Sequence, residues 1–131
     1  MSIPEGFYAG AQERTRLWVR DFLLRRFENG AMAVHFGVLD DDAAMRRAGM
    51  GAVHMAVRFI DAHGPDTRLI LEPLLDDPDP GVRAYAAGYL MKHMPDRALA
   101  ALERLNEQRT GPGKRLAARF LRRYKTGAPP L

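Results

Sequence analysis

The sequence contains no cysteine, a single tryptophan and no long uninterrupted apolar run. Without cysteine, disulfide bonds and thiolate chemistry are excluded, and the absence is typical of cytoplasmic proteins. A membrane-spanning helix needs roughly 18 or more predominantly apolar residues in succession, and no segment here provides them. Residues 1–5 also lack the basic and apolar regions of a signal peptide. We therefore expect a cytoplasmic protein that does not bind a membrane.

Motifs of catalysis and metal binding are missing as well. We find no Ser-His-Asp or Cys-His arrangement, no glycine-rich phosphate loop and no zinc-ligand spacing. The adjacent aspartates Asp40, Asp41 and Asp42 lack the alternate spacing and distal glutamate of a calcium loop. Four histidines do not converge by their spacing, and we expect structural roles for them: His35, His54, His63 and His93. The sequence predicts no enzyme, no metal site and no cofactor.

Helix signals dominate the 131 residues, which suffice for one domain. The clearest signal lies at residues 74–90, where one helix ends and a second begins. Asp79 is placed as an N-cap and Pro80 suits the first helical position, where its missing N–H costs nothing. Val82, Ala86 and Tyr89 then recur at helical spacing, and the alanines leave room for a close neighbour. Upstream, residues 69–75 predict a shorter apolar helix that Pro73 should kink.

This hairpin is repeated. The pattern Pro-Gly-x-Arg-x-x-Ala at residues 80–86 recurs at residues 112–118, and Pro-Asp-x-x-Leu at residues 65–69 recurs at residues 95–99. A helical hairpin cannot bury its apolar face alone, and stacked copies solve that problem. The sequence therefore predicts two copies of one helix–turn–helix unit.

The run at residues 73–83, followed by Ala86, Ala87 and Leu90, resembles a HEAT repeat, and the whole chain resembles short bacterial HEAT-like domains. The resemblance implies an all-α fold, a short α-α superhelix of about three antiparallel helix pairs. It implies one HEAT-like domain over residues 1–131, comprising a long helix pair (1–64), a clear repeat (65–94), a degenerate repeat (95–126) and a tail (127–131). It also implies that Arg83 and Arg115 bond aspartates in neighbouring turns.

The N-terminal half predicts two long helices. The first should run from about Gln12 past Phe27 and is apolar over more than half its circumference. Either the apolar segment 31–39 folds back over it, or the helix is a dimer or partner surface. Asn29-Gly30 and Gly37 are candidate breaks. The second helix should start at the three aspartates and end at Gly64, with Met45, Met50 and Met55 filling the core beside Gly49 and Gly51.

Charge is the strongest functional signal. Residues 92–131 carry 10 lysines and arginines against 3 acidic residues, whereas residues 1–91 carry 10 against 13. By the HEAT resemblance the second helices line a concave face, so we name five partner-binding candidates: Lys92, Lys114, Arg119, Arg122 and Arg123. We predict a non-enzymatic protein–protein interaction module for a partner with an acidic surface, such as a bacterial immunity or adaptor protein. The alternatives are nucleic-acid binding through the basic C-terminal helix and a homodimer through the first helix.

Overall fold

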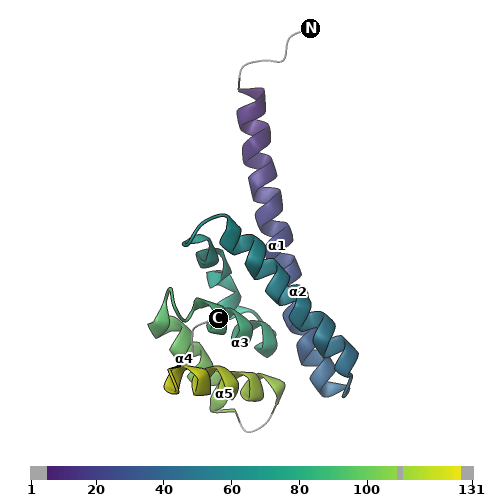
Figure 1. The fold of residues 1–131 in the computed structure, drawn as a ribbon, viewed down its shortest axis with the longest axis vertical. Helices are drawn as coiled ribbons and strands as arrows, with labels where there is room; N and C mark the ends of the chain where they lie inside the picture. Colours follow the sequence, from purple (N-terminus) through teal and green to yellow (C-terminus); the bar gives the residue numbers. More distant parts are fainter. Residues whose placement is uncertain (1–5, 109–110, 128–131) are drawn as a thin grey trace.

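The computed structural model describes residues 6–108 and 111–127, and every regular element in these ranges is a helix (Figure 1). The all-α class is therefore confirmed, while the HEAT-type superhelix stays a prediction. The elements follow one another as α1 (Phe7–Leu39), α2 (Ala43–Ala62), the 3₁₀ helix η1 (Thr67–Asp76), α3 (Pro80–Leu90), α4 (Pro95–Asn106) and α5 (Pro112–Lys125).

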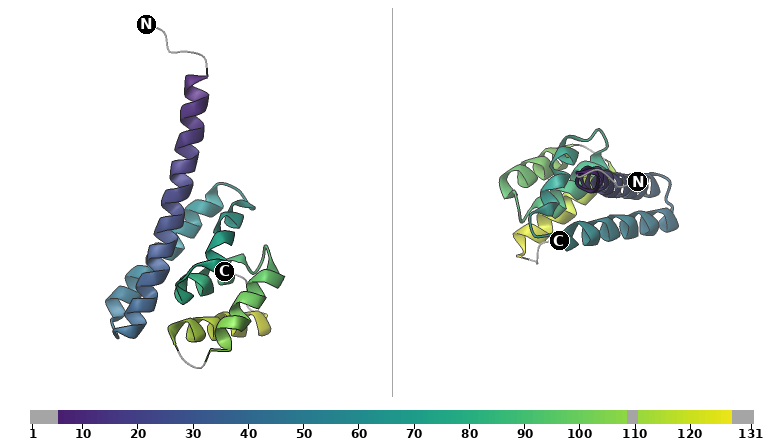
Figure 2. Two further views of the ribbon diagram at one scale, coloured as in Figure 1. Left: turned by 180° about the vertical axis from the view of Figure 1, so that it is seen from behind. Right: turned by 90° about the horizontal axis from the view of Figure 1, so that it is seen from above.

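Helices α1 and α2 form an antiparallel hairpin that packs along one side of the other helices (Figures 1 and 2). The turn between them ends at Asp42, whose carboxylate accepts from the Met45 N–H at 3.0 Å, as its predicted role as an N-cap requires. The two helices cross closely where Gly30 meets Gly49, because a Cβ on Gly49 would lie 2.5 Å from the Gly30 oxygen. Gly51 has open space around it, so the close approach to α1 involves Gly49 and not Gly51.

Helix α1 corrects two expectations. It is one unbroken helix of 33 residues, so neither Asn29-Gly30 nor Gly37 breaks it, and it starts before Gln12. Residues 31–39 continue the helix instead of folding back over its first half. Both glycines are buried under α2. Packing against α2 stabilises the helix at the two positions where glycine would otherwise weaken it. As a result the first half of α1 extends beyond the rest of the molecule (Figure 1).

The turn before α3 has the structure that its sequence predicts. The Asp79 carboxylate accepts from the Val82 N–H at 2.9 Å, and Pro80 occupies the first turn of α3. The Asp77 carboxylate accepts from the Asp79 N–H at 2.9 Å. Arg83 donates to the carbonyl oxygens of Asp77 and Pro78, so it fixes its own turn rather than bonding a neighbouring aspartate. The segment before this turn is a 3₁₀ helix through Pro73, which has no N–H to donate.

Helix α3 is the centre of the core and contacts α1, η1, α4 and α5 (Figure 2). Its residues 84–90 are all buried, and both predicted alanines, Ala86 and Ala87, are fully inaccessible. The closest approach falls at Gly88, where a Cβ would lie 2.8 Å from the Phe120 ring of α5. Glycine, more than alanine, therefore sets the spacing between α3 and α5.

Two expectations about core residues need correction. Met45 and Met55 are 36% and 50% exposed, and among the three methionines of α2 only Met50 packs against the core. The reason is register, since Val53, Ala56 and Ile60 already fill the buried face of α2. In α5, Leu116, Phe120 and Leu121 are buried, whereas Tyr124, near the end of the helix, is half exposed.

Arg68 joins three parts of the chain. Its guanidinium donates to both carboxylate oxygens of Asp61 at 2.7 and 2.8 Å, and to the Tyr89 carbonyl oxygen at 3.1 Å. It also stacks over the Tyr89 ring, 5.5 Å from its centre. The hydrogen bond from Arg68 lowers the pKa of Asp61. The end of α2 is thereby tied through η1 to α3.

Asp61→Asn is expected to lower the free energy of unfolding by about 1 kcal/mol at pH 7, a charge-assisted bond discounted for the exposure of Asp61. Because the folded pKa of Asp61 is lowered, the stabilisation is complete above the unfolded value of about 3.8 and is lost as pH falls through the folded pKa. Urea unfolding of both proteins between pH 7 and pH 3 measures this. A difference in stability that stays constant down to pH 3 would contradict the proposed pairing.

Candidate functional site

A groove lies between the α1–α2 hairpin and α5, with a volume of about 460 Å³. Its lining combines an apolar floor with a basic rim, and we name it the basic groove. Helices α1, α2, α3 and α5 all contribute to it, because the end of α1 and the start of α2 lie opposite α5. The lining residues are Val34, Val38, Asp41, Arg46, Met50, Tyr85, Arg115, Leu116 and Arg119.

Three arginines give the basic groove its charge. Arg46 donates to the Gly37 carbonyl oxygen at 3.1 Å and lies 3.7 Å from an oxygen of Asp41, so it is held in place at the end of α1. Arg115 and Arg119 are four residues apart on α5 and thus share one face of that helix. Within residues 6–108 and 111–127, no carboxylate lies within ion-pair distance of either. Two guanidinium groups therefore remain available to an anionic ligand.

Tyr85 also lines the basic groove. The side chain is 5% exposed and its ring packs edge-to-face on Phe120, with ring centres 5.6 Å apart. Burial raises the pKa of the Tyr85 hydroxyl, and the positive charge of Arg119 opposes that rise. The hydroxyl thus stays protonated at neutral pH and is a neutral donor beside a cation.

The structure separates the five predicted partner-binding residues. Arg119 lines the basic groove, whereas Arg122 is exposed elsewhere on α5 and Lys92 is exposed in the turn after α3. Arg123 is half-buried. Lys114 donates to the carbonyl oxygens of Asn106 and Gln108 at 2.9 and 2.8 Å, and so caps the end of α4. Of the five, Arg119 has the surroundings of a binding residue.

Most residues of the basic groove cannot be predicted from the sequence. Arg46 and Tyr85 are not among the candidates that the sequence names, and Arg115, expected to bond an aspartate, instead lines the groove. The Arg115–Arg119 spacing is a usable signal, because i and i+4 side chains share a helix face. For Arg46 no local signal exists, since its place depends on how the hairpin packs against α5.

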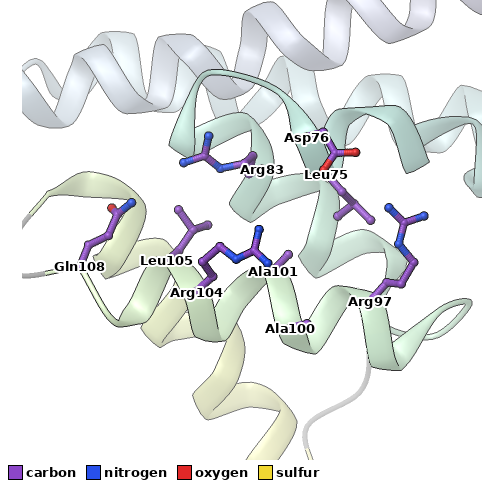
Figure 3. A pocket seen from close by; sticks show the side chains of 9 residues that line it. All are labelled: Leu75, Asp76, Arg83, Arg97, Ala100, Ala101, Arg104, Leu105 and Gln108. Atoms are coloured by element: carbon purple, nitrogen blue, oxygen red, sulfur yellow. The ribbon is translucent and has the colours of Figure 1, made fainter.

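A second groove, of about 480 Å³, lies between η1, α3 and α4 (Figure 3). Arg83, Arg97 and Arg104 stand around it over a floor that includes Leu75 and Leu105. Two of these arginines already have partners: Arg83 bonds the turn before α3, and Arg97 forms an ion pair with Glu72. Most of this charge therefore serves the fold, which makes this groove the weaker candidate for an anionic ligand.

A third surface is apolar. Along the free half of α1, Tyr8, Trp18 and Phe22 are 62%, 66% and 49% exposed, and the rings of Trp18 and Phe22 stack 5.8 Å apart. A groove of about 290 Å³ adjoins Phe22, and we name it the apolar groove. Its lining is Phe22, Leu23, Arg26, Met55, Ala56 and Phe59. Contiguous apolar exposure of this kind marks interaction surfaces.

Three acidic side chains, Glu28, Asp77 and Asp79, lie close together at the turn before α3. A hydrogen bond to Asp77 raises the pKa of Glu28, and burial and the charges of Asp77 and Asp79 act in the same direction. His35 lies opposite, its Nδ1 3.1 Å from an oxygen of Asp79. These contacts join α1 to the start of α3. In the described part of the chain, no set of three or more histidine and acidic side chains is arranged to hold a metal ion.

Comparison of the chain with known protein families, with curated proteins and with solved structures finds no match. The helices of the described ranges also include none with the length and apolar character needed to cross a bilayer.

Proposed function

We propose that this protein is a non-enzymatic protein–protein interaction module whose basic groove holds an acidic segment of its partner. The observation that carries the proposal is the placement of Arg115 and Arg119 beside an apolar floor, with no carboxylate within ion-pair distance of either in the described ranges. Arginine suits this role because its planar fork pairs with carboxylates through two parallel hydrogen bonds.

The composition of the groove favours a peptide over a nucleic acid. Val34, Val38 and Leu116 form a floor that an apolar side chain of the partner would cover. Asp41 on the rim can accept a hydrogen bond from a peptide N–H group, a donor that a phosphate backbone does not offer. An acidic segment with one apolar anchor therefore matches the groove in both charge and polarity.

The distribution of charge along the chain also favours an acidic partner. Residues 92–131 carry 10 basic residues against 3 acidic ones, and α5 lies within this segment. A surface of one sign raises the rate of encounter with a partner of the opposite sign, and salt weakens this effect. Within this class, an immunity or adaptor role in a bacterium remains a prediction from the HEAT resemblance.

Arg119→Glu is expected to weaken partner binding about tenfold or more, since it replaces an attraction at the groove with a repulsion. Arg122→Glu is the matched control, because it makes the same charge change on the same helix outside the groove lining. The measurement is capture from a nuclease-treated lysate of the source organism, with the bound protein quantified by mass spectrometry. The thermal midpoints of both variants should stay close to that of the wild type.

Nucleic-acid binding through α5 gives a different result. Phosphate contacts are nearly independent of one another, so both substitutions would then weaken binding by similar amounts and nuclease treatment would abolish capture. Equal effects of the two variants would contradict the basic groove as the binding site. A loss of thermal stability in Arg119→Glu would assign that side chain to the fold instead.

A further inference from the structure

We infer that two copies of this chain associate through the free halves of α1, packed antiparallel, with Tyr8 of each copy seated at the apolar groove of the other. The interface is separate from the basic groove, so this inference does not depend on the proposed function. Four independent features of α1 support it: an uncovered face, a heptad pattern, complementary charges, and a knob and groove at matching positions.

The first feature is the uncovered face. Residues 12–18 are all exposed, and no other element of the described chain lies beside α1 where it extends past the end of α2 (Figure 1). A solitary helix of this length is marginal in water, and its aromatic side chains remain hydrated at a free-energy cost. A second helix along this face would relieve both penalties.

The second feature is the spacing of that face. Tyr8, Ala11, Thr15, Trp18 and Phe22 follow one another at intervals of three and four residues, which is the a/d pattern of a coiled coil. We name these five residues the α1 seam. In an antiparallel pair whose two-fold axis passes between Thr15 and Trp18, Trp18 faces the second copy's Thr15. Phe22 then faces the second copy's Ala11, so each large side chain meets a small one.

The third feature is charge. Arg14 and Asp21 flank the α1 seam, seven residues or about 10 Å apart along the helix, which is too far for pairing within one chain. In the antiparallel register each Arg14 lies beside the second copy's Asp21, and the two-fold axis generates the pair twice. A parallel pair would instead place Arg14 beside the uncharged Val19. The charges therefore favour the antiparallel direction.

The fourth feature is the match between the two ends of the α1 seam. Phe7 and Tyr8 pack edge-to-face with ring centres 5.6 Å apart and form a projecting pair. The apolar groove starts at Phe22, 15 residues or about 22 Å further along α1. With the two-fold axis between Thr15 and Trp18, Tyr8 lies between the levels of the second copy's Phe22 and Arg26, which line the apolar groove. Arg26 at the groove edge then lies over an aromatic ring.

The buried area is that of a small but specific interface. Tyr8, Trp18 and Phe22 expose half to two-thirds of their surfaces. With about 150–250 Å² per aromatic side chain, two copies contribute roughly 600–800 Å² from these rings alone. Met55 and Phe59, 50% and 56% exposed, bring the total to the roughly 1,000 Å² that a specific interface needs. We expect a dissociation constant in the micromolar range, about 1–50 µM.

The test is sedimentation velocity of the full chain from about 1 to 200 µM, a range set by the expected affinity. The emission of Trp18, the single tryptophan, should shift to shorter wavelength over the same range as the ring leaves water. Trp18→Ala should weaken the dimer about 50-fold or more, as loss of a central aromatic anchor does. Leu39→Ala, which removes a 58% exposed side chain at the other end of α1, is the control and should change the dissociation constant less than about twofold.

Charge exchange tests the register. R14D and D21R should each weaken the dimer about tenfold, because each creates two repulsive pairs across the axis. The double variant R14D/D21R should restore the affinity to within about threefold of the wild type. Circular dichroism of each variant checks that the helix content is unchanged. A chain that stays monomeric to 200 µM would overturn the inference, and so would single variants that leave the affinity unchanged or a double variant without rescue.

A second experiment distinguishes binding to a second copy from binding to a lipid surface, since an apolar helix face flanked by arginines also suits a membrane interface. Vesicles of zwitterionic phospholipid with about one-third anionic phospholipid are the probe for electrostatic and apolar binding. Sedimentation of the chain with these vesicles, combined with a monomeric chain in their absence, would overturn the dimer and assign the face to lipid. A concentration-dependent dimer that leaves the vesicles unbound supports it.

Discussion

Gly49→Ala is expected to destabilise the protein by about 3 kcal/mol or more, a large effect for a single methyl group. The added Cβ would lie 2.5 Å from the Gly30 oxygen and 2.8 Å from the Val34 nitrogen. Both are backbone atoms of α1, so no side chain can rotate away to make room. The hairpin would have to separate along its length, which would loosen the packing of Val53 and Val34 as well.

Gly51→Ala is the matched control for this change. It lies on the same helix two residues away, is exposed, and a Cβ added there would have no neighbour within 4 Å. Because alanine is the better helix former, this variant should be more stable than the wild type by about 0.5–1 kcal/mol. Urea unfolding followed by circular dichroism measures both. Equal effects of the two substitutions would show that α1 and α2 do not cross at Gly49.

Phe27→Ala is expected to lower the free energy of unfolding by about 3–5 kcal/mol. Phe27 is fully inaccessible, and its ring packs edge-to-face on Tyr89 with ring centres 5.9 Å apart. Its removal leaves a cavity at the contact between α1 and α3, the centre of the core. For a domain whose total stability is about 5–15 kcal/mol, this change removes a large fraction.

Phe36→Ala makes the same chemical change on the same helix at a site that is 45% exposed. The loss there should be less than about 1 kcal/mol, because nearly half of the Phe36 surface stays in water and its removal leaves no enclosed cavity. Unfolding is followed at about 1 µM protein, at or below the expected dissociation constant, so that association contributes little. If both variants lost similar stability, the assignment of Phe27 to the core would be wrong.

The start of α3 can be predicted from the sequence because every cause of it is local. Asp79 and Pro80 specify a helix start through their own hydrogen-bonding and φ preferences, whatever packs around them. The same holds for Asp42 at the start of α2. The resemblance of residues 73–90 to a HEAT repeat leads to the same helices, since that motif consists of these local signals.

The course of α1 cannot be predicted in this way. Gly30 and Gly37 weaken a helix by propensity, and only their burial under α2 explains why the helix continues through them. Register decides which methionines are buried, because Met55 lies one residue from Ala56, which faces the core. Such outcomes depend on which surface a helix meets, and the sequence of that helix does not contain this information.

The basic groove falls between these cases. Arg119 is a candidate from the sequence because the charge of α5 is a property of that helix alone. Its neighbours Arg46 and Val34 come from the other end of the chain, and contact between distant segments carries no local signal. Nothing in the sequence predicts Tyr85 as a core residue or as a donor, yet its ring packs in the core while its side chain also lines the groove.

The second half of α1 packs against the core and the first half does not, so the two halves differ in local stability. Residues 27–37 cannot unwind without opening the core, because Phe27, Ala31 and Val34 are buried there. Residues 7–18 have no such restraint and can fray turn by turn while the rest of the protein stays folded. Any ligand of that end is therefore bound by a segment that gains order on binding, so its affinity includes the entropy lost by about three turns of helix.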